Sequence, residues 1–201
     1  MLRAGADKVS LNTAAIRRPQ FIREAARRFG SSTVVVSIEA VRKQDGWYEA
    51  YTDNGREKTG LDATNWALQA AELGAGEILV TSVDREGTGS GIDLELTRQI
   101  SESVDLPVIA CGGVGTMLDV LEAVTEGQAQ AVSIASMLHY SSIRNQPISR
   151  DSFAEDINTD FLFSGRQFAR IEDATLLEIK EYLRSQGVES GRATRATTQT
   201  C

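Results

Sequence analysis

The stretch Thr33-Val34-Val35-Val36-Ser37-Ile38 decides the fold class of this chain, because nearly all of its residues are β-branched. A continuous run of this kind is typical of a strand that is buried on both faces, as in a parallel sheet covered by helices. Runs of similar character predict further strands over residues 7–11, 77–81, 107–110 and 131–134. We therefore expect about five parallel strands.

Apolar residues recur at helical spacing in the intervals between these strands. Glycines or other helix-ending residues follow several of these segments, as Gly30 and Gly74 do. Strands that alternate with helices predict βαβ units and a parallel sheet of the α/β class. The expected helices cover residues 19–30, 62–74, 94–100, 118–124 and 176–183.

Three segments depart from this alternation. Asp45-Gly46 lies between strand-forming residues and predicts a hairpin over residues 41–51, and Asp53-Asn54-Gly55 predicts another turn. Residues 141–173 combine mixed charge with scattered aromatic residues and are interpreted as an insertion. Residues 187–201 are small and polar, which predicts a disordered tail. The folded domain is therefore expected over residues 1–186.

The composition narrows the function classes. The 201 residues carry a formal net charge of −7, which argues against non-specific nucleic-acid binding. No apolar run approaches the ~20 residues that span a membrane, and the first residues lack the apolar core of a secretion signal. Only Cys111 and Cys201 are cysteines, too few for a disulfide framework. A cytoplasmic protein is expected.

Glycine-rich segments follow two of the predicted strands. In parallel α/β folds, functional groups collect on the loops after the carboxyl ends of the strands. Residues 84–91 and the pair Gly112-Gly113 allow backbone N–H groups to approach an anion closely. Ala135-Ser136 opens the loop after the last strand, at the start of a predicted helix. These loops predict a phosphate site, although the glycines could simply turn the chain.

Few titratable residues occupy comparable positions. Glu39 ends the most apolar strand and is a candidate acid–base group, the alternative being a capping role or an ion pair with Arg42 or Lys43. Lys8 and Glu77 lie near the amino ends of their strands, where an ion pair at the opposite mouth of a barrel is expected.

Neither a metal site nor a cofactor site is predicted. His139 is the only histidine and has no Cys, Asp or Glu at metal-ligand spacing, so it is interpreted as structural. Cys111 is expected to pack as a small hydrophobe at a strand end.

Several segments, in the right order, resemble the cyclase subunit of imidazole glycerol phosphate synthase. They are residues 5–15 (GADKVSLNTAA), 81–88 (TSVDREGT), 109–113 (IACGG) and 135–140 (ASMLHY). The resemblance runs to about Tyr140 and resumes at the last helix. The sister isomerase of histidine biosynthesis shares the barrel, but Asn12-Thr13 and the Ser82-Val83-Asp84-Arg85 loop favour the cyclase. The resemblance implies a partial (β/α)8 TIM barrel covering roughly strands 4 to 8.

The resemblance also implies a function. A glutaminase partner subunit supplies ammonia, which crosses the barrel and reacts with a bis-phosphorylated substrate. The products are imidazole glycerol phosphate and aminoimidazole carboxamide ribotide. Lys8 and Glu77 would lie at the ammonia entrance, and Glu39 would be catalytic. The implied phosphate-binding residues are Asn12 and Thr13 at one site, and Glu86, Gly87, Gly112, Gly113, Ala135 and Ser136 at the other.

Three departures from the family keep other interpretations open. Glu39 and Glu86 stand where aspartate is usual, the family's first-strand aspartate has no counterpart, and residues 141–173 match nothing in the family. A fragment of a longer protein is therefore expected. One alternative is a cyclase-like paralogue that supplies ammonia for amidine formation on a nucleotide-sugar in surface-polysaccharide synthesis. The other is a non-catalytic phosphate-binding scaffold.

Overall fold

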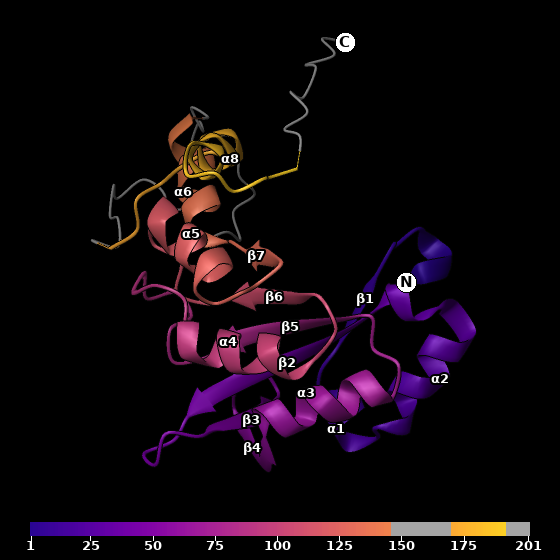
Figure 1. Ribbon diagram of the computed structural model, residues 1–201. Coiled ribbons are helices and arrows are strands. Elements are labelled where there is room, and N and C mark those ends of the chain that lie inside the picture. Colours follow the sequence, from indigo (N-terminus) through magenta and orange to yellow (C-terminus); the bar gives the residue numbers. More distant parts are fainter. Residues whose placement is uncertain (146–169, 192–201) are drawn as a thin grey trace, which may run out of the picture.

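The computed structural model describes residues 1–145 and 170–191 of the chain (Figure 1). Its strands are β1 (Val9–Leu11), β2 (Val34–Arg42), β3 (Tyr48–Thr52), β4 (Glu57–Asp62), β5 (Glu77–Ser82), β6 (Val108–Cys111) and β7 (Ala131–Ser133). Its α-helices are α1 (Thr13–Arg17), α2 (Gln20–Phe29), α3 (Ala63–Glu72), α4 (Leu94–Ser103), α5 (Met117–Thr125), α6 (Ser136–Asn145) and α8 (Leu176–Ser185). All five predicted parallel strands and the five predicted helices are confirmed.

The parallel strands lie side by side in the order β1, β2, β5, β6, β7. Within the described residues β1 and β7 each have one neighbour, so the sheet is an open arc rather than a closed ring. Helices follow the strands and lie along one side of this arc (Figure 1). Repeated parallel βα units of this kind make the chain a partial (β/α)8 barrel.

Strand β2 is longer than the sequence predicted and has two neighbours along one edge. Its first residues, Val34 to Val36, pair with β1, and its last residues, Glu39 to Arg42, pair antiparallel with β3. The opposite edge of β2 pairs with β5. The predicted hairpin is confirmed, and it explains why the strand does not end at Ile38: β3 continues the ladder beyond the point where β1 stops.

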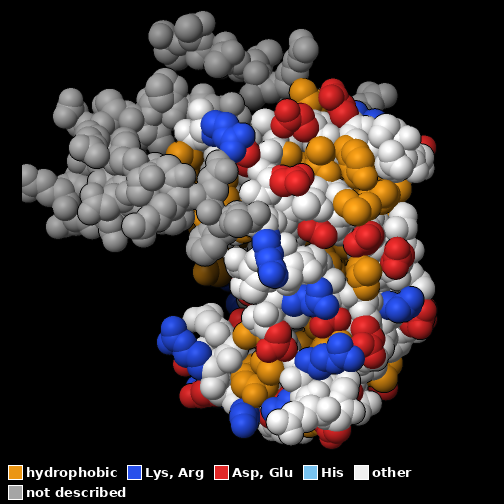
Figure 2. All heavy atoms as spheres, turned by 90° about the vertical axis from the view of Figure 1, so that its left-hand side faces the viewer, with side chains coloured by type: hydrophobic (Ala, Val, Ile, Leu, Met, Phe, Trp, Pro, Cys, Tyr) orange, Lys and Arg blue, Asp and Glu red, His pale blue; other side chains and the backbone are white. Residues whose placement is uncertain are grey.

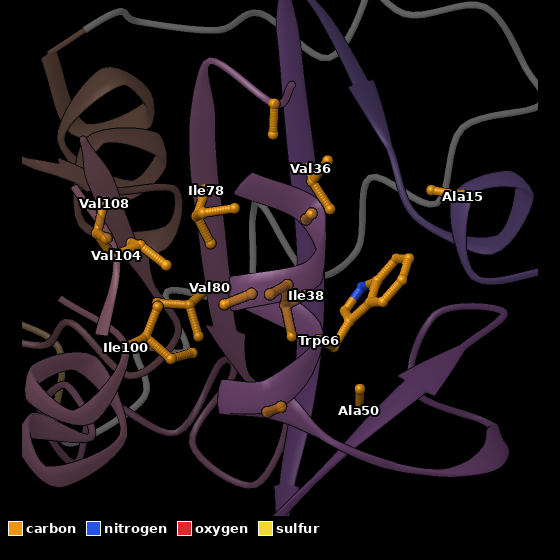
Figure 3. Close-up of a cluster of buried hydrophobic side chains, with 14 of the residues drawn as sticks. Ala15, Val36, Ile38, Ala50, Trp66, Ile78, Val80, Ile100, Val104 and Val108 are labelled. Carbon is orange, nitrogen blue, oxygen red and sulfur yellow. The ribbon is translucent and has the colours of Figure 1, made fainter. Parts of the chain in front are cut away.

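The main hydrophobic core lies between the sheet and its helices (Figure 3). Alternate residues of β2, namely Val34, Val36, Ile38 and Ala40, are fully buried on this outer face. Trp66 of α3 packs into the same cluster. Burying each large aliphatic side chain contributes about 1.5–3 kcal/mol, so this face supplies much of the stability. The cluster also contains Ile78, Val80, Ile100, Val104 and Val108.

A second hydrophobic cluster joins the later helices to β6. Val120 of α5, Met137 of α6 and Ile179 of α8 are buried together with Ile171, which precedes α8. Both α5 and α8 begin with a capping box, in which Thr116 and Thr175 accept from the third residue of each helix. These caps fix where each helix starts.

Two boundaries differ from the sequence prediction. Residues 13–17, between the first predicted strand and the first predicted helix, form the short helix α1. The insertion expected over residues 141–173 is narrower at both ends, because residues 141–145 continue α6 and Ile171 belongs to the second cluster. The remainder of that insertion, 146–169, and the end of the predicted tail, 192–201, lie outside the described residues.

The surface seen from the left of Figure 1 carries acidic and basic side chains side by side (Figure 2). Charge of one sign therefore does not dominate this view. The described helices include none that is both long enough and apolar enough to cross a membrane.

Candidate functional site

Four side chains form a row across the inner face of the sheet, near the carboxyl ends of its strands. The strand register places Glu39 beside Thr81, Thr81 beside Cys111, and Cys111 beside Ser133. Because alternate residues of a strand point to opposite faces, these four lie on the face that the helices do not cover. The row is accessible from this face, since each of the four side chains is only half-buried or is exposed.

Glu39 is held by the tip of the β3–β4 hairpin. Its Oε2 accepts a hydrogen bond of 2.7 Å from the backbone N–H of Gly55. Gly55 has a φ of 73°, and a Cβ there would lie 2.8 Å from Cγ1 of Val83. Only glycine therefore brings this N–H close enough without displacing Val83, which begins the loop after β5.

Of the two alternative roles for Glu39, the ion pair with Arg42 or Lys43 is wrong, whereas capping agrees with the hydrogen bond from the N–H of Gly55. Arg42 pairs with Glu95 at 2.8 Å, and Lys43 pairs with Glu49 at 2.7 Å. The carboxylate of Glu39 remains on the inner face, beside Thr81, where it could exchange a proton with a bound molecule.

A small pocket lies at the other end of the row. It is formed by the loops after β5 and β6 and by the start of α6. Gly87, Gly112 and Gly113 have φ values of 71°, 95° and 101°, which glycine adopts without strain and which are the conformations found in anion-binding loops. The first N–H groups of α6 have no intrahelical partners, so the start of this helix carries partial positive charge beside the pocket. The residues lining the pocket include Glu86, Gly87, Gly112, Gly113, Ala135 and Ser136.

The glycines of the pocket do more than turn the chain. A Cβ on Gly113 would lie 2.2 Å from the carbonyl oxygen of Gly91, and one on Gly112 would lie 2.7 Å from that of Ser82. Gly91 in turn donates to the carbonyl of Gly113 at 2.8 Å. The loops after β5 and β6 therefore touch through their backbones and form a candidate anion cradle, in which the Glu86 carboxylate also takes part as a lining group.

Cys111 differs from its expected role as a small core residue. It does end β6, but its side chain lines the pocket, with Sγ 3.9 Å from Oε2 of Glu86. Burial raises the pKa of the thiol, and Thr81 and Ser133 are among its hydrogen-bond partners. Cys111 is therefore a neutral polar group in the row rather than a nucleophile.

Asn12 and Thr13 lie at the opposite side of Glu39 from the pocket, at the end of β1. The Asn12 amide donates to the carbonyls of Ser37 and Tyr51 at 3.1 and 3.2 Å. The Thr13 hydroxyl donates to Asn12 and accepts from the N–H of Asp53. Both side chains therefore fix the hairpin against β1, and the pocket residues and this pair occupy two separate places along the mouth of the arc.

Lys8 and Glu77 form the predicted ion pair. Glu77 begins β5, so the pair lies at the amino end of the strands, away from Glu39. The side chain of Lys8 is 48% exposed and that of Glu77 is 19% exposed. The pair therefore lies at a surface that a solute can reach.

Thr81 and Ser133 lie in the row and Gly55 contacts it, but the sequence did not predict these three as site residues. Alternation along a strand predicts which residues share a face. It does not predict that Thr81 and Ser133 lie in one row with Glu39, because this depends on the register of neighbouring strands. Gly55 was recognised as a turn residue, and its contact with Glu39 depends on how the hairpin folds back. Among the described residues, no group of three or more His, Cys, Asp or Glu side chains could hold a metal ion.

A parallel βα arc with a glycine-lined pocket and a carboxylate at the carboxyl ends of its strands is typical of phosphate-binding barrel proteins. The chain belongs to the histidine biosynthesis protein family, which it matches over residues 1–144.

Two relatives are named imidazole glycerol phosphate synthase subunit HisF. The one from Alkaliphilus metalliredigens (strain QYMF) is 48% identical over 158 residues, covering 79% of this chain and 63% of the relative. The one from Trichormus variabilis (strain ATCC 29413 / PCC 7937) is 53% identical over 147 residues, covering 71% of this chain and 57% of the relative. The chain thus spans less than two thirds of the length of these curated relatives.

Proposed function

We propose that the protein containing this chain is the cyclase-lyase subunit of imidazole glycerol phosphate synthase. It would form imidazole glycerol phosphate and aminoimidazole carboxamide ribotide from a bis-phosphorylated ribulosyl substrate and ammonia. One observation carries the proposal: Glu39 lies between two candidate anion sites, in a chain about half identical to relatives bearing that name. A substrate with a phosphate at each end would then hold its reacting centre near the carboxylate.

The two candidate phosphate sites would bind by different means. At the pocket, the backbone N–H groups of Gly87 and Gly113 and the start of α6 supply partial positive charge. At the end of β1, the side chains of Asn12 and Thr13 are engaged with the hairpin, so a phosphate there would have to share their hydrogen-bonding groups.

Glu39 would act as an acid–base group on the bound substrate. Its side chain is one methylene longer than the family's aspartate, a difference of about 1 Å in reach. The hydrogen bond from Gly55 fixes one oxygen of this longer side chain and leaves the other available for proton transfer. The hairpin therefore supports the substitution of Glu for Asp.

Ammonia would enter at the opposite end of the strands, next to Lys8 and Glu77. This ion pair borders the amino end of the inner face, whereas Glu39 lies toward the carboxyl end of the same face. A glutaminase subunit bound there would release ammonia at the opposite end of the strands from the substrate. The complex would work in the cytoplasm, without a cofactor.

The names of the relatives favour the histidine enzyme over a surface-polysaccharide paralogue. The test is to incubate the full natural protein with an ammonium salt and the bis-phosphorylated substrate, and to measure both products. Product formation supports the cyclase. Reaction only with a nucleotide-sugar acceptor would instead identify the paralogue, and phosphate binding without either reaction would identify a scaffold.

A further inference from the structure

A short segment outside the pocket, residues 170–173, contacts each of the three parts of the chain that form it. These parts are the loop after β5, the loop after β6 and helix α6. None of residues 170–173 lines the pocket itself. Any influence on a bound anion must therefore pass through the loops and the helix.

The contact with the loop after β6 is a backbone hydrogen bond. The N–H of Glu172 donates to the carbonyl of Gly115 at 2.8 Å. The approach is so close that a Cβ on Gly115 would lie 2.3 Å from the carbonyl oxygen of Arg170. Gly115 lies two residues after Gly113, so this bond fixes the far end of the pocket's second loop.

The contact with the loop after β5 is a packing contact. A Cβ on Gly89 would lie 2.7 Å from the carbonyl oxygen of Arg170 and 2.8 Å from Cγ1 of Ile171. Ile171 is only 7% exposed, in the same cluster as Val114 and Met137. These two residues directly follow Gly113 and Ser136, so the Ile171 side chain belongs to the core on which two parts of the pocket rest.

The third contact is an ion pair with α6. Oδ1 of Asp173 lies 2.5 Å from Nη2 of Arg144, and the Asp173 side chain is only 12% exposed. Arg144 lies two turns along the helix from Ser136, whose N–H end faces the pocket. The pair therefore restrains the helix along its axis.

We propose that residues 170–173 are a positioning element for the phosphate pocket, holding its two loops and its helix in the arrangement that binds an anion. This inference rests on the proposed phosphate site. An anion bound by backbone N–H groups from three separate segments depends on their mutual spacing, and small displacements weaken all the hydrogen bonds together. The segment contacts all three of these parts.

The test compares Ile171→Ala with Ile171→Val in the full natural protein, by titration with inorganic phosphate. Valine keeps the Cγ atom that touches Gly89, whereas alanine removes it. We expect Ile171→Ala to weaken phosphate binding about tenfold and to raise KM more than it lowers kcat, with valine restoring most of the affinity. Leu177→Ala, at a side chain 41% exposed on α8, is the matched control and should bind as the wild type does.

Two further variants keep the test decisive if Ile171→Ala does not fold. Gly115→Ala places a methyl group against the carbonyl of Arg170 and should weaken phosphate binding, whereas Gly191→Ala, in open space, should not. Wild-type affinity in both Ile171→Ala and Gly115→Ala would overturn the positioning role. A wild-type protein that binds no phosphate would overturn the phosphate site itself, and a wild type that binds with unchanged variants would overturn only this inference.

Discussion

The two faces of the sheet differ in what they contribute. On the outer face Val36, Ile38 and Val80 are almost completely buried beneath helices. On the inner face, the neighbouring positions Ser37, Glu39 and Thr81 remain half-buried and are mostly polar. In β2, the even-numbered side chains therefore contribute to the hydrophobic core, whereas Ser37 and Glu39 face the candidate site. Because the two sets alternate, substitutions can separate the contributions cleanly.

The largest expected effect is on the inner face. Glu39→Gln keeps the size of the side chain and an oxygen that can accept from Gly55, but removes the acid–base group. We expect turnover with ammonia to fall by about 10²–10⁴-fold, while phosphate affinity and thermal stability stay near the wild-type values. Glu72→Gln, on the exposed side of α3, is the control. Unchanged turnover in Glu39→Gln would remove the carboxylate from the mechanism.

The converse substitution is on the outer face. Ile38→Ala leaves a cavity beneath α3 and should lower the free energy of unfolding by about 2–5 kcal/mol, measured by urea denaturation. The same truncation at Leu68, which is 40% exposed on α3, should cost far less. Once folded, the Ile38→Ala protein should retain the KM of the wild type. A raised KM with normal stability would show that the two faces are not separable.

A smaller effect on stability and on phosphate binding is expected in the loop after β6, which belongs to neither face. Gly112→Ala must adopt a φ near 95° and bring a methyl group within 2.7 Å of the carbonyl of Ser82. The strain should cost about 1–3 kcal/mol, divided between folding and phosphate binding. Titration with phosphate and thermal unfolding of the same variant would measure the two shares. Gly191→Ala again provides a glycine in open space, where neither quantity should change.

The smallest effect concerns an ion pair on the inner side of the hairpin. Glu49 lies opposite Val41 and has a pKa below its ordinary value, because Lys43 and the N–H of Gly60 bond to it. Glu49 raises the pKa of Lys43 in turn. Glu49 therefore adds stability above its unfolded pKa and loses it as the pH falls through its folded pKa. Lys43 adds stability below its unfolded pKa and loses it as the pH rises through its folded pKa.

Glu49→Gln should therefore flatten the dependence of stability on pH in the acid range, with a smaller loss between about pH 7 and pH 3 than in the wild type. Urea denaturation at both pH values measures this difference. Glu57→Gln, at an exposed glutamate on β4, should leave the wild-type slope in place. An equal slope in Glu49→Gln and the wild type would mean that the pair does not contribute.

The sequence predicts the outer face well because hydrophobic periodicity and helix caps are local signals. The run at residues 33–38 and the helix-ending glycines Gly30 and Gly74 depend only on nearby residues. The pocket residues were predicted as a group because parallel strands bring the loops after them to one edge. By contrast, the row from Glu39 to Ser133 depends on strand register, and the contact of Gly55 with Glu39 depends on hairpin geometry. No local pattern encodes either.

The shared edge of β2 also makes the hairpin a convenient place for protein engineering. The β3–β4 hairpin pairs only with the last four residues of β2. The turn that connects β2 to β3, at Gln44 and Asp45, is exposed and lies at the opposite end of β3 from Gly55. An epitope or a fluorescent group inserted between Gln44 and Asp45 would project into solvent, while β1 and β5 keep β2 in register. The protein could then be captured or tracked without altering the carboxylate or the anion cradle.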